Sequence, residues 1–323
     1  MKSLKLSALV VVALALATLK LHAQETGSFD RNLQVSGPVD LEVTSGSGSV
    51  KVHSGASGNV HVYAFIRARD SWFGLGAQEK IKRLQANPPI EQLGNTIHVG
   101  RIEDRELQQN ISIDYDITVP AQTKLSSQTG SGSQTVEGLQ LGVNVHAGSG
   151  SLTVENVSGS VRARTGSGTI RVNDIKGSLD AEAGSGSIRA HGIGGEVSVN
   201  TGSGNIEVEQ TAPGSVRAGA GSGSLKLYGV KGSVRAETGS GHISVEGDPT
   251  GDWRVGTGSG GIDLRIPQNA SFTIDARTSS GRLSVNRQVS MQGTFSRNHV
   301  QGKVGNGGVL LDLHTGSGNI EVD

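Results

Sequence analysis

A tripeptide, Gly-Ser-Gly, recurs through the middle of this sequence at an almost constant spacing. Its first glycines are residues 130, 148, 166, 184, 202, 221, 239 and 258, so successive copies are 18 or 19 residues apart. Between two copies, apolar and polar residues alternate in two short runs, for example 169–173 and 178–183, which is the pattern of half-buried β-strands. This period predicts a parallel β-solenoid in which each repeat forms one coil.

Coils of this kind must stack, because a single coil has too few apolar side chains to be stable alone. Stacking adds a ladder of backbone hydrogen bonds and closes the apolar interior from both sides. We therefore predict an all-β fold, a parallel solenoid with coils of about 18 residues, and right-handed winding because parallel crossovers favour that hand. Equivalent side chains should then lie above one another, as we expect for Ile170, Ile188, Ile206 and Leu225.

Composition supports a turn-rich β protein and excludes several classes of function. The 323 residues include 49 glycines and no cysteine, and 3% are aromatic. Glycine at this level, combined with alternating β-branched residues, is typical of an all-β chain with many turns. The formal net charge is zero, which gives no electrostatic reason to expect binding of nucleic acid, whose binders carry a basic face. Without cysteine there are no disulfides, zinc–thiolate sites or thiol nucleophiles.

The amino-terminal residues have the features of an export signal. Lys2 and Lys5 precede an apolar run over 6–19, and Ala23 ends a small-residue cleavage motif. The run is shorter than the roughly 20 residues that span a bilayer. We therefore expect residues 1–23 to be a cleaved signal peptide and the mature chain to be periplasmic, on the cell surface or secreted.

The period divides the remaining chain into segments. Strand-like alternation without the 18-residue period, and one helical stretch at about 76–86 that ends before two prolines, indicate an irregular cap. Such a cap protects the open end of a solenoid from edge-to-edge association. After residue 285 the period is interrupted and then returns. We predict a cap over 24–124, regular coils over 125–285, a loop insertion over 286–304 and a C-terminal coil over 305–323.

Motifs along the chain resemble those of a known family. Val119-Pro120 leads into a Thr-Gly-Ser-Gly turn, repeated TGSGxIxV units follow, and GGVLLDLHTGSGNIEV stands near the C-terminus. This arrangement resembles a bacterial domain-of-unknown-function family labelled "putative adhesin". The resemblance implies a secreted or envelope-associated parallel β-helix, and it supplies no catalytic residues.

Charged residues recur in register on the polar faces of the predicted strands. At the coil spacing, Arg162 lies beside Asp180, Arg164 beside Glu182 and Arg189 beside Glu207, and such cross-strand pairs help to fix the register. Three arginines instead share one column. Like charges repel unless an anion or a neighbouring carboxylate offsets them, so an acidic glycan or an anionic lipid is an alternative partner for Arg217, Arg235 and Arg254.

The glycine–serine turns carry no ligand chemistry that the sequence supports. A phosphate-binding loop opens a helix, whereas each of these turns leads into a strand. Calcium-binding repeats place an aspartate in each turn, and these turns have none, so we predict folding without calcium. We expect the hydroxyl groups to form a ladder along one corner, as a solvated turn or a contact surface, that includes Thr165, Ser167, Thr201, Ser203, Thr238 and Ser240.

Catalysis has little support in the sequence. Asp114 and Asp116 share a strand face, which a carboxylate pair requires, but an exposed polar strand face has the same pattern. The nine histidines are scattered without metal-ligand spacing. Trp72 and Phe73 mark either core or an exposed contact loop. We therefore predict a non-enzymatic structural or adhesive β-solenoid without metal or cofactor. Its partner is unknown, and the candidates are an envelope or host glycan and another envelope protein; a polysaccharide-acting enzyme and an envelope-stress component are the alternative functions.

Overall fold

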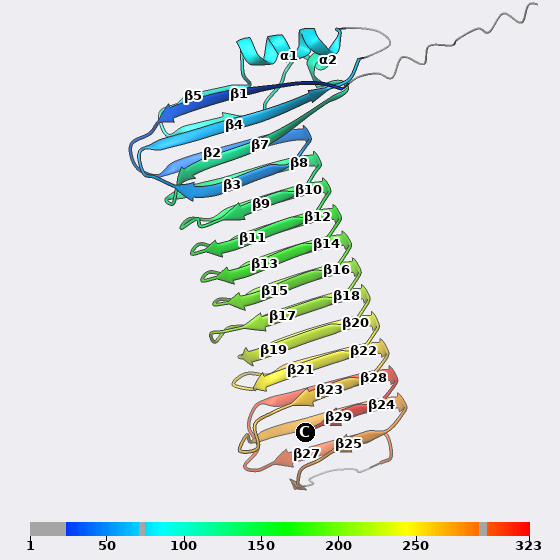
Figure 1. Ribbon diagram of the computed structural model, residues 1–323. Coiled ribbons are helices and arrows are strands. Elements are labelled where there is room, and N and C mark those ends of the chain that lie inside the picture. Colours follow the sequence, from blue (N-terminus) through cyan, green and yellow to red (C-terminus); the bar gives the residue numbers. More distant parts are fainter. Residues whose placement is uncertain (1–23, 71–74, 291–295) are drawn as a thin grey trace, which may run out of the picture.

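The computed structural model describes residues 24–70, 75–290 and 296–323, and the predicted signal peptide lies outside them. Two long β-sheets, which we call sheet A and sheet B, face each other along a rod (Figure 1). Each coil contributes one strand to each sheet, and neighbouring coils pair in parallel. The predicted all-β parallel solenoid is confirmed.

The strands follow a spatial order that differs from the sequence order at both ends of the rod. Sheet A runs through β1 (Glu25–Gln34), β4 (Asn59–Ala68), β7 (Ile111–Pro120), β3 (Val50–Gly55), β9 (Gln134–Glu137), β11 (Leu152–Val157), β13 (Ile170–Ile175), β15 (Ile188–Ile193), β17 (Ile206–Gln210), β19 (Leu225–Lys231), β21 (Ile243–Asp248), β23 (Ile262–Arg265), β29 (Ile320–Val322) and β25 (Leu283–Val285). Sheet B runs through β26 (Val289–Ser290), β27 (His299–Val304), β24 (Phe272–Ser280), β28 (Leu310–Ser317), β22 (Trp253–Ser259), β20 (Val234–Ser240), β18 (Val216–Ser222), β16 (Val197–Ser203), β14 (Leu179–Ser185), β12 (Val161–Ser167), β10 (Val143–Ser149), β8 (Thr123–Ser131), β2 (Val39–Ser47), β6 (Thr96–Val99) and β5 (Ile90–Leu93). The helices are α1 (Ala77–Ala86) and α2 (Arg105–Gln108).

The core consists of columns of equivalent apolar side chains between the two sheets. Because alternate residues of a strand point to opposite faces, a coil that keeps the 18-residue register returns the same position to the interior. Ile170 is directly paired with Ile188, Ile188 with Ile206, and Ile206 with Leu225. All four side chains are buried, so the predicted stacking is confirmed.

The Gly-Ser-Gly corner is shaped by close contact between successive coils. Gly150 has φ +152°, and a Cβ on it would lie 2.1 Å from the carbonyl oxygen of Gly132 in the preceding coil. At the opposite corner several coils turn through a left-handed residue. Asn156 and Asp174 have φ 56° there, and residues of this type tolerate that conformation better than most. The Gly-Ser-Gly corner is therefore the more regular of the two.

At the N-terminal end, the regular stack begins earlier than the sequence period indicates. Strands β2 and β3 lie within the segment predicted as a cap, yet they pair in parallel with β8 and β9 in the register of a normal coil. On their other side they pair in parallel with β6 and β7, which come later in the chain. The first coil therefore lies between two later segments, and only the remaining part of 24–124 covers the end.

Helix α1 lies across β1 and β4 at this end of the rod (Figure 1). Ile81 and Leu84 are buried, and a Cβ on Gly27 of β1 would lie 2.4 Å from Ile81 Cγ2. Lys80 is also buried, with its Nζ donating to the carbonyl oxygen of Gln109 at 2.8 Å. The predicted helix is present, and the structure adds the short helix α2, whose N-cap Asp104 accepts from the backbone of Glu106.

The C-terminal coil does not end the stack. Strand β28 lies between β22 and β24, and β29 lies between β23 and β25, with parallel pairing on both sides. The segment predicted as a loop insertion contains β26 and β27, which pair with each other, and β27 also pairs antiparallel with β24. The chain passes the position of its final coil, forms the end of the rod, and then returns.

Candidate functional site

The threonines of the turn corner point into the protein, contrary to the predicted exposed hydroxyl ladder. Thr201 and Thr238 are buried and donate to the carbonyl oxygens of Gly186 and Gly223 of the preceding coils at 2.8 and 3.0 Å. Thr165 makes the equivalent bond to Gly150 at 3.0 Å. Only the serines remain exposed, so the threonines hold coils together and do not form a contact surface.

The three arginines singled out in the sequence form one column on the exposed face of sheet B. Arg217 is paired in register with Arg235, and Arg235 with Arg254. Adjacent strands bring these residues to a spacing of about 4.8 Å. We call Arg217, Arg235 and Arg254 the arginine column. They border a hollow of about 310 Å³.

Two carboxylates offset part of this positive charge. Glu237 accepts from Arg235 at 2.9 Å, and Asp312 accepts from Arg254 at 3.2 Å. Within the described part of the chain, Arg217 has no ion pair; its neighbours in the column are Ser198 and Arg235. The column therefore keeps one uncompensated positive charge at its β18 end.

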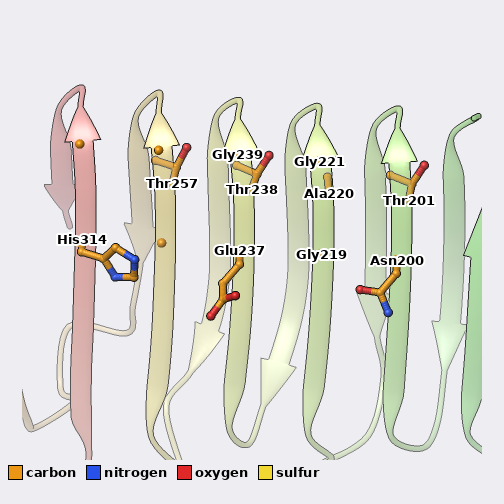
Figure 2. Close-up of a pocket in the computed structure, with 13 residues that line it drawn as sticks. Asn200, Thr201, Gly219, Ala220, Gly221, Glu237, Thr238, Gly239, Thr257 and His314 are labelled. Carbon is orange, nitrogen blue, oxygen red and sulfur yellow. The ribbon is translucent and has the colours of Figure 1, made fainter. Parts of the chain in front are cut away.

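A trough lined partly by glycines lies beside the arginine column. Gly219 and Gly256 occupy the next outward positions on the strands of Arg217 and Arg254, and a trough of about 680 Å³ extends over them. Asn200, Glu237 and His314 stand in this trough, each on a strand two positions from the next (Figure 2). We call this trough the glycine shelf.

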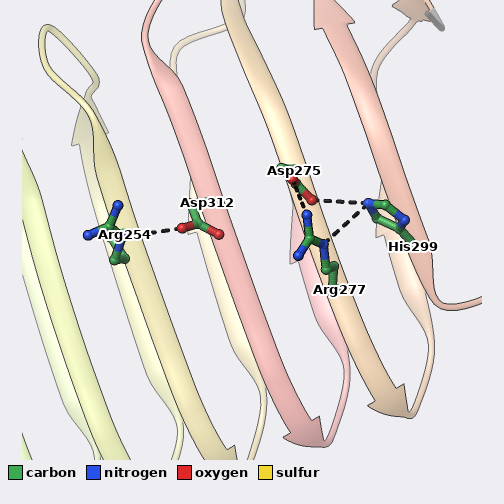
Figure 3. Close-up of polar contacts among 5 residues, drawn as sticks. All are labelled: Arg254, Asp275, Arg277, His299 and Asp312. Carbon is green, nitrogen blue, oxygen red and sulfur yellow. Dashed lines mark hydrogen bonds and ion pairs between the residues drawn. The ribbon is translucent and has the colours of Figure 1, made fainter. Parts of the chain in front are cut away.

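Beyond Arg254 the column continues into a network that the sequence did not reveal. Asp312 stands between Arg254 and Asp275, and Asp275 contacts Arg277 at 2.6 Å and His299 at 3.1 Å (Figure 3). Asp312 belongs to the intercalated C-terminal coil, 58 residues from Arg254. A constant offset of 18 residues does not predict this pair, although the same strand position in the repeat does.

The other predicted charge pairs are present, with one difference. Arg162 bonds Asp180 at 2.9 Å, and Arg164 lies 3.4 Å from Glu182. Arg189 and Glu207 are register partners, but no ion pair joins them within the described residues. These contacts connect consecutive coils and leave the central part of sheet B nearly neutral, in contrast to the arginine column.

The candidate catalytic carboxylates serve separate structural contacts. Asp114 lies 2.5 Å from Arg67 and accepts from the Ser49 backbone at 2.7 Å, whereas Asp116 lies 3.3 Å from His53. In the described residues no group of three or more potential ligands is arranged to hold a metal ion.

One predicted site lies outside the residues that the structure describes, and one further finding concerns membrane-spanning helices. The predicted contact loop with Trp72 and Phe73 falls in 71–74, outside the described residues. Across the described ranges, neither helix has the length and apolar character needed to cross a bilayer.

Several solved structures are similar to the chain, at low sequence identity and low TM-score. Three solved structures resemble the chain over 92% of its length: a "putative cell adhesion protein" from Clostridium sporogenes ATCC 15579 (10% identity, 99% of that chain, TM-score 0.25), a "putative adhesin" from Bacteroides fragilis NCTC 9343 (11%, 97%, 0.36) and a "putative lipid binding protein" from Parabacteroides distasonis ATCC 8503 (14%, 96%, 0.36). At these scores the similarities carry no functional argument. No curated protein matched the sequence.

A family match gives the firmer relationship. The family described as Toastrack DUF4097 matches residues 193–323, which include the arginine column, the glycine shelf and the intercalated coil. The resemblance stated from the sequence motifs was to a bacterial family of unknown function, and it is confirmed by this match. Over residues 193–323 the chain is thus similar to the Toastrack DUF4097 family, a domain of unknown function with a solenoid-like β-repeat.

Proposed function

We propose that this protein is an exported, non-enzymatic structural or adhesive module of the bacterial cell envelope, and that its arginine column binds an acidic glycan. The observation that carries the proposal is the column itself: three arginines in register on an exposed face, with one charge left uncompensated. Guanidinium groups bind carboxylates through two parallel hydrogen bonds. A row of them favours a partner with repeated negative charges.

The geometry favours an extended polymer over a single compact head group. The arginines follow the axis of the rod at about 4.8 Å per strand, so a linear ligand along the axis meets one cation per strand. In the adjacent shelf the side chains of Asn200 and His314 lean over Gly219 and Gly256: a Cβ on these glycines would come within 2.5 and 2.2 Å of them. A sugar ring beside the column would therefore meet these polar side chains while its carboxylate faces the arginines.

We propose no enzyme mechanism, because the candidate catalytic carboxylates do not act as a pair. Asp114 is engaged with Arg67, and Asp116 with His53. The rigid stack instead supports a long, regular surface, which suits adhesion or scaffolding.

The test is binding of a linear polyuronate by the mature chain and by a triple variant of the column. Arg217→Gln, Arg235→Gln and Arg254→Gln together should weaken binding at least tenfold, since each loses a charge-assisted hydrogen bond of roughly 1.5 kcal/mol or more. A control with the same change in net charge on sheet A should bind normally; it carries Arg171→Gln, Arg189→Gln and Lys226→Gln. Equal loss in both variants, or no loss in either, contradicts the proposed site.

A second arm separates the glycan from an anionic lipid and tests the location. Vesicles containing phosphatidylglycerol replace the polyuronate; binding of vesicles but not of the polymer contradicts the glycan assignment.

To test the location, intact cells are treated with protease and the chain is detected with an antibody. Cleavage supports adhesion at the surface, protection supports a periplasmic structural role, and recovery of the uncleaved precursor in the cytoplasm contradicts export.

A further inference from the structure

A cleft of about 440 Å³ opens at the N-terminal end of the rod, far along the chain from the arginine column. One wall is the Gly-Ser-Gly corner of the first coil, including Ser45 and Gly46. The opposite wall comes from the segment that joins β6 to β7, with Arg101 and Ile102. In the regular stack the next coil covers this corner; here the joining segment leaves a space.

The base of the cleft contains a buried hydroxyl group without a partner. Tyr115 on β7 lines the cleft, and its side chain is almost fully buried. Within the described part of the chain its hydroxyl makes no hydrogen bond. Burial raises the pKa of this hydroxyl far above its ordinary value, so it is a donor at physiological pH. A buried polar group without a partner is costly, and in folded proteins such groups are rare.

The position of this hydroxyl follows from the packing around it. The ring of Tyr115 packs edge-on against Phe29, with the centroids 6.5 Å apart. A Cβ on Gly100 would come within 3.1 Å of the Tyr115 oxygen and within 2.0 Å of the Thr44 carbonyl oxygen. Any side chain at Gly100 would therefore occupy the space in front of the hydroxyl.

The rest of the lining combines an apolar wall with one weakly paired cation. Ile102, Ile111 and Ile113 supply hydrocarbon surface. Arg101 stands in the same lining with a half-exposed side chain. Its ion pair with Glu42 is long, at 3.9 Å, and Glu42 also contacts His98 at 2.8 Å. Small-molecule sites have this composition: mostly apolar walls, a few polar groups, and a volume of several hundred Å³.

We propose that this cleft binds a small amphipathic carboxylic acid, whose hydrocarbon part lies against the three isoleucines. One of its oxygens accepts a hydrogen bond from the Tyr115 hydroxyl, and its negative charge is balanced by Arg101. The site is independent of the proposed glycan surface, because the two share no residue.

Octanoate, with octanol as its neutral analogue, tests the proposal on the full mature chain by calorimetry. We expect octanoate to bind at least tenfold more tightly than octanol. Arg101→Gln should remove this preference, and Tyr115→Phe should weaken octanoate binding by roughly tenfold. The control Tyr63→Phe, on the exposed face of β4, should leave binding unchanged.

Stability measurements keep the outcome interpretable. Because the Tyr115 hydroxyl has no protein partner, Tyr115→Phe should fold and should melt at the same or a higher temperature than the parent. Octanoate should raise the melting temperature of the parent but not that of Arg101→Gln. Failure of octanoate to bind the parent, or equal binding by parent, Tyr115→Phe and Arg101→Gln, would overturn the proposal; the cleft would then hold only water.

Discussion

The two ends of the rod share one topological device and differ in how they are covered. At each end the coil nearest to the chain terminus lies inside the stack, with other strands beyond it: β2–β3 at one end and β28–β29 at the other. At the N-terminal end, sheet A finishes in the ten-residue β1, and helix α1 packs on it. At the C-terminal end, sheet A finishes in β25, which has three half-buried residues, and among the described residues no helix packs on it.

This difference illustrates two ways to make a sheet edge unavailable for pairing. A long edge strand needs a cover, and α1 provides it with Ile81 and Leu84. A very short edge strand needs none, because it offers few unpaired backbone groups to another chain. Sheet B uses the second solution at both ends, with the four-residue β5 and the two-residue β26.

We expect the largest effect from deleting the C-terminal coil, which lies between two earlier layers, and we compare it with deletion of a regular coil. Deletion of 305–323 removes the layer between β22–β23 and β24–β25, so we expect amide protection across 253–285 to fall roughly hundredfold or more in hydrogen exchange. Deletion of 161–178 removes one regular coil and joins equivalent positions, so protection elsewhere should persist in a shorter rod. Similar loss in both would show that intercalation gives no special role to the last coil.

The two end covers should respond differently to loss of an apolar side chain. Ile81→Ala leaves a cavity between α1 and β1 and should cost about 2 to 4 kcal/mol of unfolding free energy. Leu283→Ala on the half-buried β25 should cost less than about 1 kcal/mol. Chemical denaturation followed by circular dichroism measures both. A larger cost for Leu283→Ala would reverse our assignment of the covered and uncovered ends.

Equivalent glycines at the end and in the interior of the stack should differ in how well they tolerate a side chain. A Cβ on Gly148 would lie 2.7 Å from the carbonyl oxygen of Gly130, whereas a Cβ on Gly46 in the first coil meets nothing within 4 Å. Gly148→Ala should therefore cost about 2 kcal/mol, and Gly46→Ala should stay within about 0.5 kcal/mol of the parent. Equal melting temperatures for the two variants would show that stacking does not require glycine at this corner.

The smallest expected effect concerns the ion pairs on sheet B. Arg162–Asp180 joins consecutive coils, and Arg254–Asp312 joins a regular coil to the intercalated one, at 2.9 and 3.2 Å. Both are exposed, so double-mutant cycles should give about 0.2 to 1 kcal/mol for each, and less in 1 M salt. A coupling several times larger for Arg254–Asp312 would mean that this pair specifically holds the intercalated coil in place.

The sequence was sufficient to predict the structure of one coil but not the spatial order of the coils in the stack. An 18-residue period predicts which side chains share a column, as Ile170 and Ile188 do. It does not predict the neighbour of a coil separated from the array by an insertion, because all coils present the same edges. We therefore wrongly assigned β2 and β3 to the cap, and we predicted no neighbours for β28 and β29. The Gly-Ser-Gly turns of both coils are nevertheless visible in the sequence.

The candidate sites differ in the same way: those within the regular array could be predicted, and those formed by segments distant in the sequence could not. The arginine column could be predicted because its members lie in the regular array, whereas its partner Asp312 could not. The orientation of the threonines was predictable: Thr165 follows the inward positions Val161 and Ala163 by even steps. The cleft at Tyr115 depends on the spatial meeting of β2, β7 and the segment before α2, which no local pattern in the sequence indicates.

The place of the final coil also determines when the molecule can finish folding. Coils along 123–265 can stack one after another as the polypeptide emerges, each on the one before it. Residues 272–285 lack their native neighbours β28 and β29 until these strands have been synthesised and lie beside β22 and β23. The native order of layers at this end of the rod therefore forms only after residues 305–323 are available.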